Sequence, residues 1–307
     1  MIKSYGLIPG IWFEFENVGE RSEIYKMSDH LLRRFGVPIT VSNRRFLDMR
    51  DKWVKDYLTE KVIKMLKDNG FGYLKVDYND NIGVGCDGAE SLGEGLRQAV
   101  LASQDFFRKI TKEIPELVIE NCSSGGHRLE PSMMELVSQA SFSDAHECLS
   151  IPIIAANLHR LIRIEQSQIW AVIRKDDDIE RINYSLASGF FGRLCLSGDI
   201  FDISDEKWEV VKEAVSFYKK AKNIIKNGFT SLIDCTAVSY NRPVGYQRVL
   251  RILGSEALLV VHTFESGANP PLNDILDKYL IADSFGSELT ADFRGKVFLL
   301  KEKPKKA

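Results

Sequence analysis

The stretch Tyr73-Leu74-Lys75-Val76-Asp77-Tyr78-Asn79-Asp80 (YLKVDYND) lies where the chain is expected to be least polar. It follows the segment Asp68-Asn69-Gly70, which is typical of the end of a helix, and its first residues favour a buried β-strand. Lys75 and Asp77 are two positions apart, so a strand places both side chains on one face. An ammonium group beside a carboxylate favours the ionised carboxylate, which suits a nucleophile or an electrostatic stabiliser. A plain structural ion pair explains the spacing equally well.

Strand-like runs alternate with amphipathic helical patterns through the first 227 residues. The runs are Gly10 to Phe15, Tyr73 to Asp77, Leu117 to Asn121, Ala140 to Ser143, Gln168 to Ile173 and Arg193 to Leu196. One helical face is predicted by Val54, Leu58, Val62 and Leu66, with Asp51 as its cap, and another by Leu96, Val100, Phe107 and Ile110 after the capping residue Ser91. This alternation predicts an α/β fold with parallel strands covered by helices.

The pattern changes after Asn227-Gly228. Short β-rich runs follow, at Thr230 to Ser239, Arg248 to Ile252, Ala257 to His262 and Lys296 to Leu300. Gly, Pro and Asn residues divide them, which favours antiparallel pairing. We therefore expect two domains: a barrel-type domain at 1–227 and a β-sandwich-like domain at 228–307.

Composition excludes several classes of protein. The 307 residues include 41 basic and 43 acidic side chains, so no strong field favours nucleic acid or an anionic membrane. No apolar run approaches the roughly 20 residues that span a bilayer. The 5 cysteines form no CxxC pair, which indicates reduced thiols rather than a disulfide framework or a zinc site. We expect a cytoplasmic protein with a small neutral ligand.

Most strand-like runs before residue 200 end on polar groups. In a parallel barrel the carboxyl ends of the strands converge on one face, where active sites lie. Asp144, after the fourth run, is the candidate for a second carboxylate facing Asp77. Two carboxylates in different environments can divide nucleophile and acid/base duties, as glycoside hydrolysis requires.

The sequence also contains patterns that resemble cofactor and metal sites. Gly83 to Gly88 spells GxGxxG, but five residues separate it from the strand, which argues against a dinucleotide cofactor. Asp144, His146 and Glu147 could bind a metal ion, although the 5 histidines show no HxH or HExxH spacing. We expect neither a cofactor nor a metal. Cys122 is expected to line a pocket and not to act as a nucleophile. Trp12 fits two interpretations equally well: an aromatic ring that stacks on a sugar, or an ordinary core residue.

Four segments in order resemble the retaining alpha-galactosidases of glycoside hydrolase family 36. They are Gly10-Ile11-Trp12-Phe13-Glu14-Phe15-Glu16, Leu74-Lys75-Val76-Asp77-Tyr78-Asn79, Glu120-Asn121-Cys122-Ser123-Ser124-Gly125-Gly126-His127-Arg128 and Ser143-Asp144. The resemblance extends through Leu196-Ser197-Gly198-Asp199. It implies a (β/α)8 TIM-type barrel of which about six strands are present, followed by an antiparallel β domain.

The resemblance also implies roles for single residues. Asp77 would be the nucleophile and Asp144 the general acid/base of a double displacement on terminal alpha-galactosides. The residues implied in sugar binding are Trp12, Lys75, Cys122, Gly125, Gly126 and Arg44, with Arg45 as the alternative to Arg44. The substrate would be an alpha-galactoside oligosaccharide or glycoconjugate.

The sequence departs from the family pattern in ways that leave three hypotheses. Phe15 and Val76 replace the usual proline and tryptophan, and no Asp-Asp-Gly-Trp segment is present. An incomplete barrel exposes strand edges, which favours a homo-oligomer or an N-terminal partner chain. The chain is therefore a glycosidase, a carbohydrate-binding remnant without turnover, or a metal-dependent hydrolase acting through Asp144, His146 and Glu147.

Overall fold

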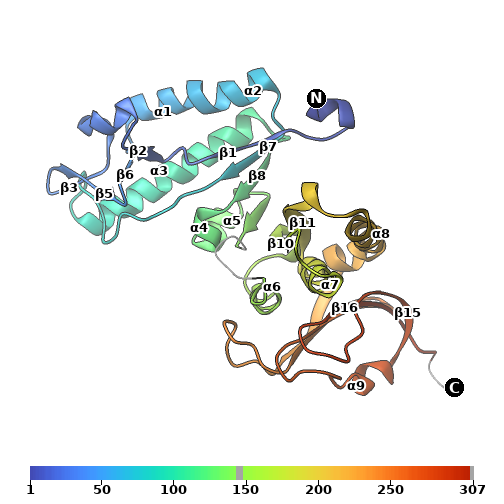
Figure 1. The fold of residues 1–307 in the computed structure, drawn as a ribbon. Coiled ribbons are helices and arrows are strands. Elements are labelled where there is room, and N and C mark those ends of the chain that lie inside the picture. Colours follow the sequence, from blue (N-terminus) through green and yellow to red (C-terminus); the bar gives the residue numbers. More distant parts are fainter. Residues whose placement is uncertain (143–147, 305–307) are drawn as a thin grey trace. The chain divides into compact units, whose positions relative to one another are not determined.

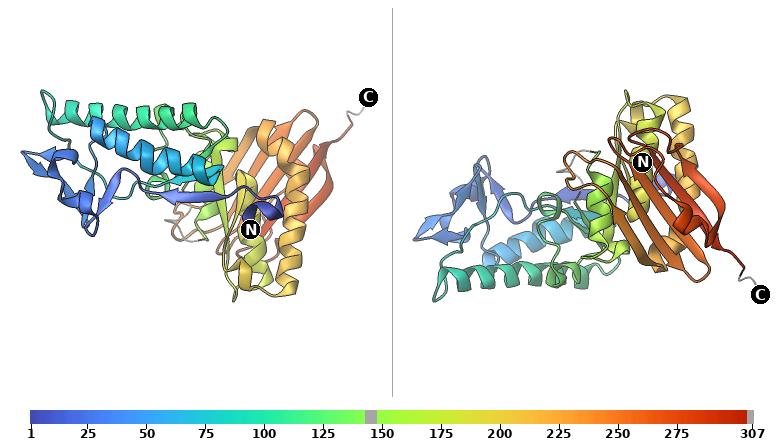
Figure 2. Two further views of the ribbon diagram at one scale, coloured as in Figure 1. Left: turned by 90° about the horizontal axis from the view of Figure 1, so that it is seen from above. Right: turned by 90° about the horizontal axis from the view of Figure 1, so that it is seen from below.

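The structure is a computed structural model that describes residues 1–142 and 148–304. The chain forms two compact units, Met1–Ala140 and Ser141–Ala307, which we describe separately. Figure 1 shows the course of the chain, and Figure 2 shows two further views of it. None of the helices in the described residues is long and apolar enough to cross a membrane.

The first unit is built on four parallel strands in the order β1-β7-β8-β9. They are β1 (Gly10–Phe13), β7 (Tyr73–Val76), β8 (Val118–Asn121) and β9 (Gln139–Ser141), the last of which ends at the boundary of the unit. The pairing places Trp12 beside Lys75, Lys75 beside Glu120 and Glu120 beside Gln139. Directly paired residues point to the same face of a sheet. This register therefore builds one polar row across the four strands.

Helices run beside these strands. Helix α1 (Lys52–Leu58), the π-helical segment η4 (Thr59–Lys64) and α2 (Met65–Asn69) follow one another without a break. Helix α3 (Leu92–Glu113) is the long blue-green helix in Figure 2. The predicted caps are confirmed, since Asp51 Oδ1 accepts from Trp53 N at 2.9 Å and Ser91 Oγ accepts from Glu94 N at 3.1 Å. Short helices α4 (Ser123–Gly126) and α5 (Pro131–Met134) follow β8.

The predicted apolar faces are confirmed for the first helix and corrected for the second. Val54, Leu58, Val62 and Leu66 are all buried. On α3, however, Val100 is 45% exposed and Leu96 is half-buried, whereas Phe106 is buried together with Phe107 and Ile110. Over the first turns of α3, the predicted apolar face is therefore offset around the helix axis from the face that is buried.

An excursion between β1 and α1 was not predicted. It contains a three-stranded sheet of β2 (Asn17–Gly19), β6 (Arg44–Phe46) and β5 (Thr40–Val41), and the strand pair β3 (Arg33–Arg34) and β4 (Val37–Pro38). Short 3-10 helices η1 (Ile2–Tyr5), η2 (Glu23–Lys26) and η3 (Ser28–His30) complete the segments outside the main sheet. Each strand has two or three residues, too few to show a two-residue period.

The second unit contains two further parallel strands and an antiparallel sheet. Strands β10 (Ser167–Ile173) and β11 (Arg193–Gly198) pair in parallel, and the helices are α6 (Ile151–Leu158), α7 (Ile179–Ser188) and α8 (Asp205–Asn227). The 3-10 segments are η6 (Ile164–Gln166), η7 (Gly189–Phe191) and η8 (Ile200–Asp202).

The antiparallel sheet has the order β12-β13-β14-β16-β15. Its strands are β12 (Phe229–Cys235), β13 (Tyr246–Leu253), β14 (Glu256–Thr263), β15 (Tyr279–Gly286) and β16 (Gly295–Glu302), with α9 (Asn273–Leu276) before β15. Helix α7 packs closely on β16, because a Cβ at Gly295 would lie 2.8 Å from Ala187 Cβ. Strand β15 was not predicted.

The predicted fold class is confirmed. In the described residues, six strands of parallel type alternate with helices, and a five-stranded antiparallel sheet follows. The compact units divide at Ala140/Ser141, and the antiparallel sheet begins at Phe229. The division into domains at 227/228 stays a prediction.

Candidate active site

Asp77 is buried directly after β7. Its backbone N–H donates to Phe13 O at 2.8 Å, which extends the parallel pairing of β1 and β7 by one residue. Asp77 is only 6% exposed. Oδ1 accepts hydrogen bonds from Tyr78 N at 3.0 Å and from Ser124 N at 2.9 Å. Two backbone N–H groups therefore fix the orientation of the carboxylate at the carboxyl end of a parallel strand.

The loop after β8 supplies one of these N–H groups. Cys122 is buried, and its N–H donates to Val76 O at 2.9 Å, so the loop starts against the end of β7. Ser124, Gly125 and Gly126 have φ values of 56°, 77° and 120°. These left-handed conformations turn the chain tightly and point Ser124 N at Asp77. The predicted residues Cys122, Gly125 and Gly126 thus lie in the loop that contacts Asp77.

Lys75 pairs with Glu120 in the described part of the chain. Lys75 Nζ lies 3.3 Å from Glu120 Oε1, and Glu120 is 3% exposed. Tyr73 OH also donates to Glu120, and Gln139 Nε2 donates to Tyr73 OH at 2.6 Å. The two-residue spacing predicts Lys75 beside Asp77, whereas Glu120 as its partner was not predicted. The pairing of β7 with β8, which creates this contact, cannot be read from local spacing.

Trp12 lies on β1 next to Lys75 on β7. Paired residues share a face of the sheet, so the indole ring borders the same polar row. Trp12 is 52% exposed, which excludes the interpretation as an ordinary core residue. An exposed aromatic ring beside an ammonium group is suited to stacking on the apolar face of a sugar.

Arg44, on β6, joins a cluster of carboxylates near Asp77. Arg44 Nη1 lies 2.9 Å from Asp80 Oδ2, and its Nε lies 3.6 Å from Glu14 Oε2. Burial raises the pKa of Glu14, Arg44 opposes this shift, and the negative charge of Asp77 adds to it. The hydrogen bond that Arg44 Nη1 donates to Asp80 Oδ2 raises the pKa of Arg44. The positive charge of the Arg44 guanidinium therefore offsets the negative charges of several carboxylates at this end of the sheet.

Arg44 and Arg45 have different contacts, and only those of Arg44 lie near Asp77. Arg45 Nη1 donates to Tyr25 O at 2.6 Å, and its guanidinium carbon lies 4.1 Å from the centre of the Tyr25 ring. Arg45 therefore belongs to the excursion, whereas Arg44 belongs to the candidate site. Glu14 and Asp80 were not proposed as site residues, although both lie within segments that the sequence analysis quoted.

Asp144 lies outside the described residues, as do His146 and Glu147. The distance between Asp77 and Asp144 therefore stays a prediction. Among residues 1–142 and 148–304, no group of three or more His, Cys, Asp or Glu side chains could hold a metal ion.

The fold and the site define a barrel-type α/β protein with a buried carboxylate at the strand ends, the arrangement of a (β/α)-barrel active site. Comparison with known proteins gives a consistent result, since the family described as Melibiase matches residues 1–228. The chain belongs to the Melibiase family.

Curated relatives are alpha-galactosidases. Mel36A of Lactobacillus acidophilus is 26% identical over 235 residues, which cover 74% of this chain and 32% of the relative. AgaA of Geobacillus stearothermophilus is 26% identical over 243 residues, which likewise cover 74% of this chain and 32% of the relative. The chain thus spans 32%, or about a third, of the length of these relatives.

Solved structures share the fold. The alpha-galactosidase from Lactobacillus brevis superimposes with a TM-score of 0.80 at 19% identity, covering 99% of this chain and 46% of that chain. A variant of AgaA in complex with raffinose gives a TM-score of 0.77 at 21% identity, covering 98% of this chain and 45% of that chain.

Proposed function

We propose that this chain carries the nucleophile of an alpha-galactosidase-type glycoside hydrolase that acts by a retaining double displacement. The observation that carries the proposal is the orientation of Asp77. In the described part of the chain, the hydrogen bonds of its side chain both fall on Oδ1, so Oδ2 is left to attack an anomeric carbon. The alpha-galactosidase relatives support this assignment.

The proposed reaction has two steps. Asp144 protonates the leaving-group oxygen while Asp77 Oδ2 bonds to the anomeric carbon and the glycosidic bond breaks. Asp144 then removes a proton from water, which attacks the same carbon and releases Asp77. Retaining enzymes need the two carboxyl groups roughly 5 to 5.5 Å apart.

The proposed sugar site lies around Asp77. Lys75 and Arg44 would hold hydroxyl groups, the Trp12 ring would stack on the sugar, and the loop with Cys122, Gly125 and Gly126 would close the other side. Solved structures of AgaA variants hold raffinose and stachyose. We propose an alpha-galactoside oligosaccharide or glycoconjugate as the substrate.

A partner polypeptide fits the first unit. Strand β1 is the end strand in the order β1-β7-β8-β9. Among the described strands of the unit, β1 therefore pairs with β7 on one side only. Unpaired edges accept strands from other chains. We propose that an N-terminal partner chain or a second copy completes the sheet, and that the protein works in the cytoplasm with reduced cysteines.

Hydrolysis of a nitrophenyl alpha-galactoside tests the function. Asp77→Asn should lower kcat by about 10³-fold or more, because no carboxylate can then form the glycosyl ester. Added azide should restore turnover and yield the galactosyl azide of inverted configuration. Undiminished activity of Asp77→Asn would contradict the assignment, and full activity in a chelator would remove metal-dependent hydrolysis.

Carbohydrate binding without turnover is the second candidate function. The 52% exposure of Trp12 favours it, since an open aromatic platform can bind a sugar without a complete active site. Calorimetry with galactose, run beside the activity assay with a homologous N-terminal segment supplied, separates the two functions. Binding without nitrophenol release would support the second.

A further inference from the structure

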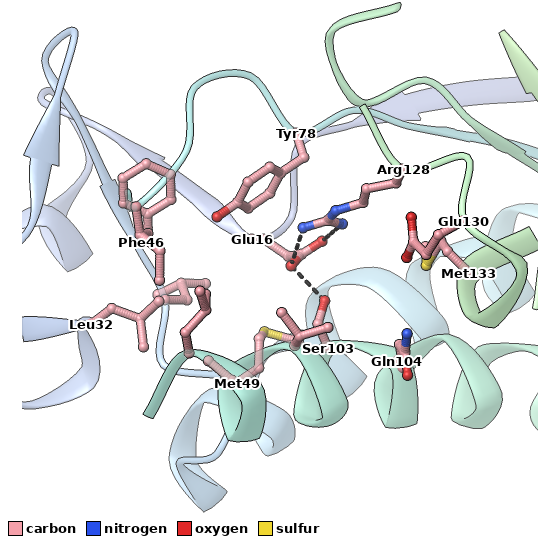
Figure 3. A pocket seen from close by; sticks show the side chains of 15 residues that line it. Glu16, Leu32, Phe46, Met49, Tyr78, Ser103, Gln104, Arg128, Glu130 and Met133 are labelled. Carbon is pink, nitrogen blue, oxygen red and sulfur yellow. Dashed lines mark hydrogen bonds and ion pairs between the residues drawn. The ribbon is translucent and has the colours of Figure 1, made fainter. Parts of the chain in front are cut away.

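Glu16, which is buried, and Arg128, which is half-buried, form an ion pair that the proposed reaction does not use. Arg128 Nη1 donates to Glu16 Oε1 at 2.7 Å and Nη2 donates to Oε2 at 3.1 Å, a bidentate arrangement. Glu16 is 5% exposed. Figure 3 shows the pair at a cavity of about 60 Å³ whose lining includes Leu32, Phe46 and Met49. Apolar surroundings strengthen the attraction within a bidentate pair.

The pair connects the segments after β1, β7 and β8 with helix α3 in the first unit. Glu16 follows β1, and it accepts a further hydrogen bond from Ser103 Oγ on α3. The guanidinium carbon of Arg128 lies 3.9 Å from the centre of the Tyr78 ring. Tyr78 is the residue after Asp77, and its N–H donates to Asp77 Oδ1. Arg128 therefore lies between the Tyr78 ring and Glu16 (Figure 3).

Arg128 also closes the loop that contacts Asp77. Its carbonyl accepts from Asn121 Nδ2 at 2.6 Å, and Asn121 Oδ1 accepts from Ser123 Oγ at 2.9 Å. Asn121 is the last residue of β8, so the loop is tied at both ends. Between these ends lies Ser124, whose N–H donates to Asp77.

The loop is strained and needs such support. Ser123 and Ser124 have φ values of 49° and 56°, which cost side-chain-bearing residues roughly 1 kcal/mol or more each. Such conformations persist only where the surrounding structure holds them. The Glu16 pair anchors the Arg128 side chain and so supports the position of the Arg128 carbonyl that accepts from Asn121. Loss of this anchor should therefore weaken the hold on the Ser124 amide.

We propose that Glu16 and Arg128 are positioning residues that hold the Ser124 N–H on Asp77 Oδ1 and so aim Oδ2 at the substrate. The consequence for catalysis rests on the proposed function, whereas the consequence for the Ser124 amide does not. Neither side chain acts on the sugar itself, so the pair should affect the rate of the chemical step more than sugar binding.

The test uses the full chain with Arg128→Lys, Arg128→Met and Glu16→Gln. Arg128→Lys keeps the charge but loses the bidentate contact. The matched control is Arg248→Met, which breaks another partly buried ion pair, with Asp234 at 2.6 Å, in the antiparallel sheet. The Ser124 amide is followed by NMR with ¹⁵N-serine labelling and amide hydrogen exchange, and is assigned with Ser124→Ala.

In folded Arg128→Lys and Glu16→Gln, the Ser124 amide resonance should shift. Its amide hydrogen should exchange at least ~10-fold faster, because the hydrogen bond that protects it is lost. They should lower kcat at least ~10-fold with KM within about two-fold. Arg248→Met should lower stability but leave the Ser124 amide unchanged. If Arg128→Met does not fold, the other two variants decide.

Two failures are distinguishable. An unchanged Ser124 amide in folded Arg128→Lys and Glu16→Gln overturns the positioning role, whatever the activity. A wild-type chain that hydrolyses no aryl galactoside, even with a homologous N-terminal segment, overturns the proposed function instead, and the amide measurement still decides the role of the pair.

Discussion

The backbone N–H of Ser124 lies 2.9 Å from Oδ1 of Asp77, although 47 residues separate the two in the chain. This hydrogen bond joins the end of β7 to the loop after β8. It brings together two sequence motifs that are far apart, and it fixes which carboxylate oxygen is left for chemistry.

The conformation of Gly126 is the first testable feature of this loop. Its φ of 120° lies in a region that side-chain-bearing residues rarely adopt. Gly126→Ala should lower the free energy of unfolding by about 1–3 kcal/mol and reduce activity, because the loop must deform. Urea denaturation measures the first effect and the aryl galactoside assay the second.

Gly93→Ala is the control for this variant. A Cβ at Gly93 would meet nothing within 4 Å, and the residue lies in the first turn of α3. Alanine should therefore leave stability unchanged or raise it by up to about 1 kcal/mol. Equal stability of the two variants would contradict a conformational requirement at Gly126.

The pair of Lys75 and Glu120 gives a second prediction. Lys75→Met leaves the carboxylate of Glu120, a residue 3% exposed, without its ammonium partner. This should cost about 3 kcal/mol of unfolding free energy. Adding Glu120→Gln should recover part of that loss, because the buried charge is then removed. Strictly additive effects in this double-mutant cycle would show that the two side chains do not interact.

A half-buried and a buried histidine of the second unit, His159 and His262, predict a pH dependence of stability. Burial lowers the pKa of His159 to about 4, and it lowers that of His262 to about 4 as well. The model-peptide pKa is about 6.5, so between pH 6.5 and 4 the unfolded chain binds more protons. The free energy of unfolding should therefore fall as pH drops through this window, by up to about 3 kcal/mol per histidine.

His159→Gln tests this linkage. His159 Nε2 donates to Phe191 O at 2.7 Å, which leaves Nδ1 of the neutral ring to accept from Thr230 Oγ1 at 3.1 Å. Urea denaturation at a series of pH values should give a shallower slope for His159→Gln than for the wild type. His127→Gln, at an exposed histidine, is the control. An unchanged slope in His159→Gln would contradict the prediction.

Elements with strong local signals were predictable from the sequence. The four-residue repeat Val54, Leu58, Val62 and Leu66 and the caps Asp51 and Ser91 depend on neighbours along the chain, and the structure has all of them. The parallel strands that precede the polar loops were predictable for the same reason. The motif around Asp77 therefore predicts the position of the candidate site from sequence alone.

Contacts that depend on tertiary pairing were not predictable. Glu120 meets Lys75 only through the register of β7 with β8, and Arg44 reaches Asp80 only through the excursion of residues 14–50. Strand β15 escaped prediction because it is an edge strand whose Leu280 and Ile281 are exposed, so it lacks a buried face. Val100 was misplaced because the spacing on α3 fits more than one buried face.

The role of Asp77 as nucleophile is tested most sharply by trapping the glycosyl ester. A galactosyl fluoride with a second fluorine on the ring slows breakdown of the ester, and peptide mass spectrometry then locates the adduct. We expect one fluorogalactosyl group on the peptide that contains Asp77, and none on Asp77→Asn. An adduct on another residue, or an equal yield from Asp77→Asn, would contradict this role.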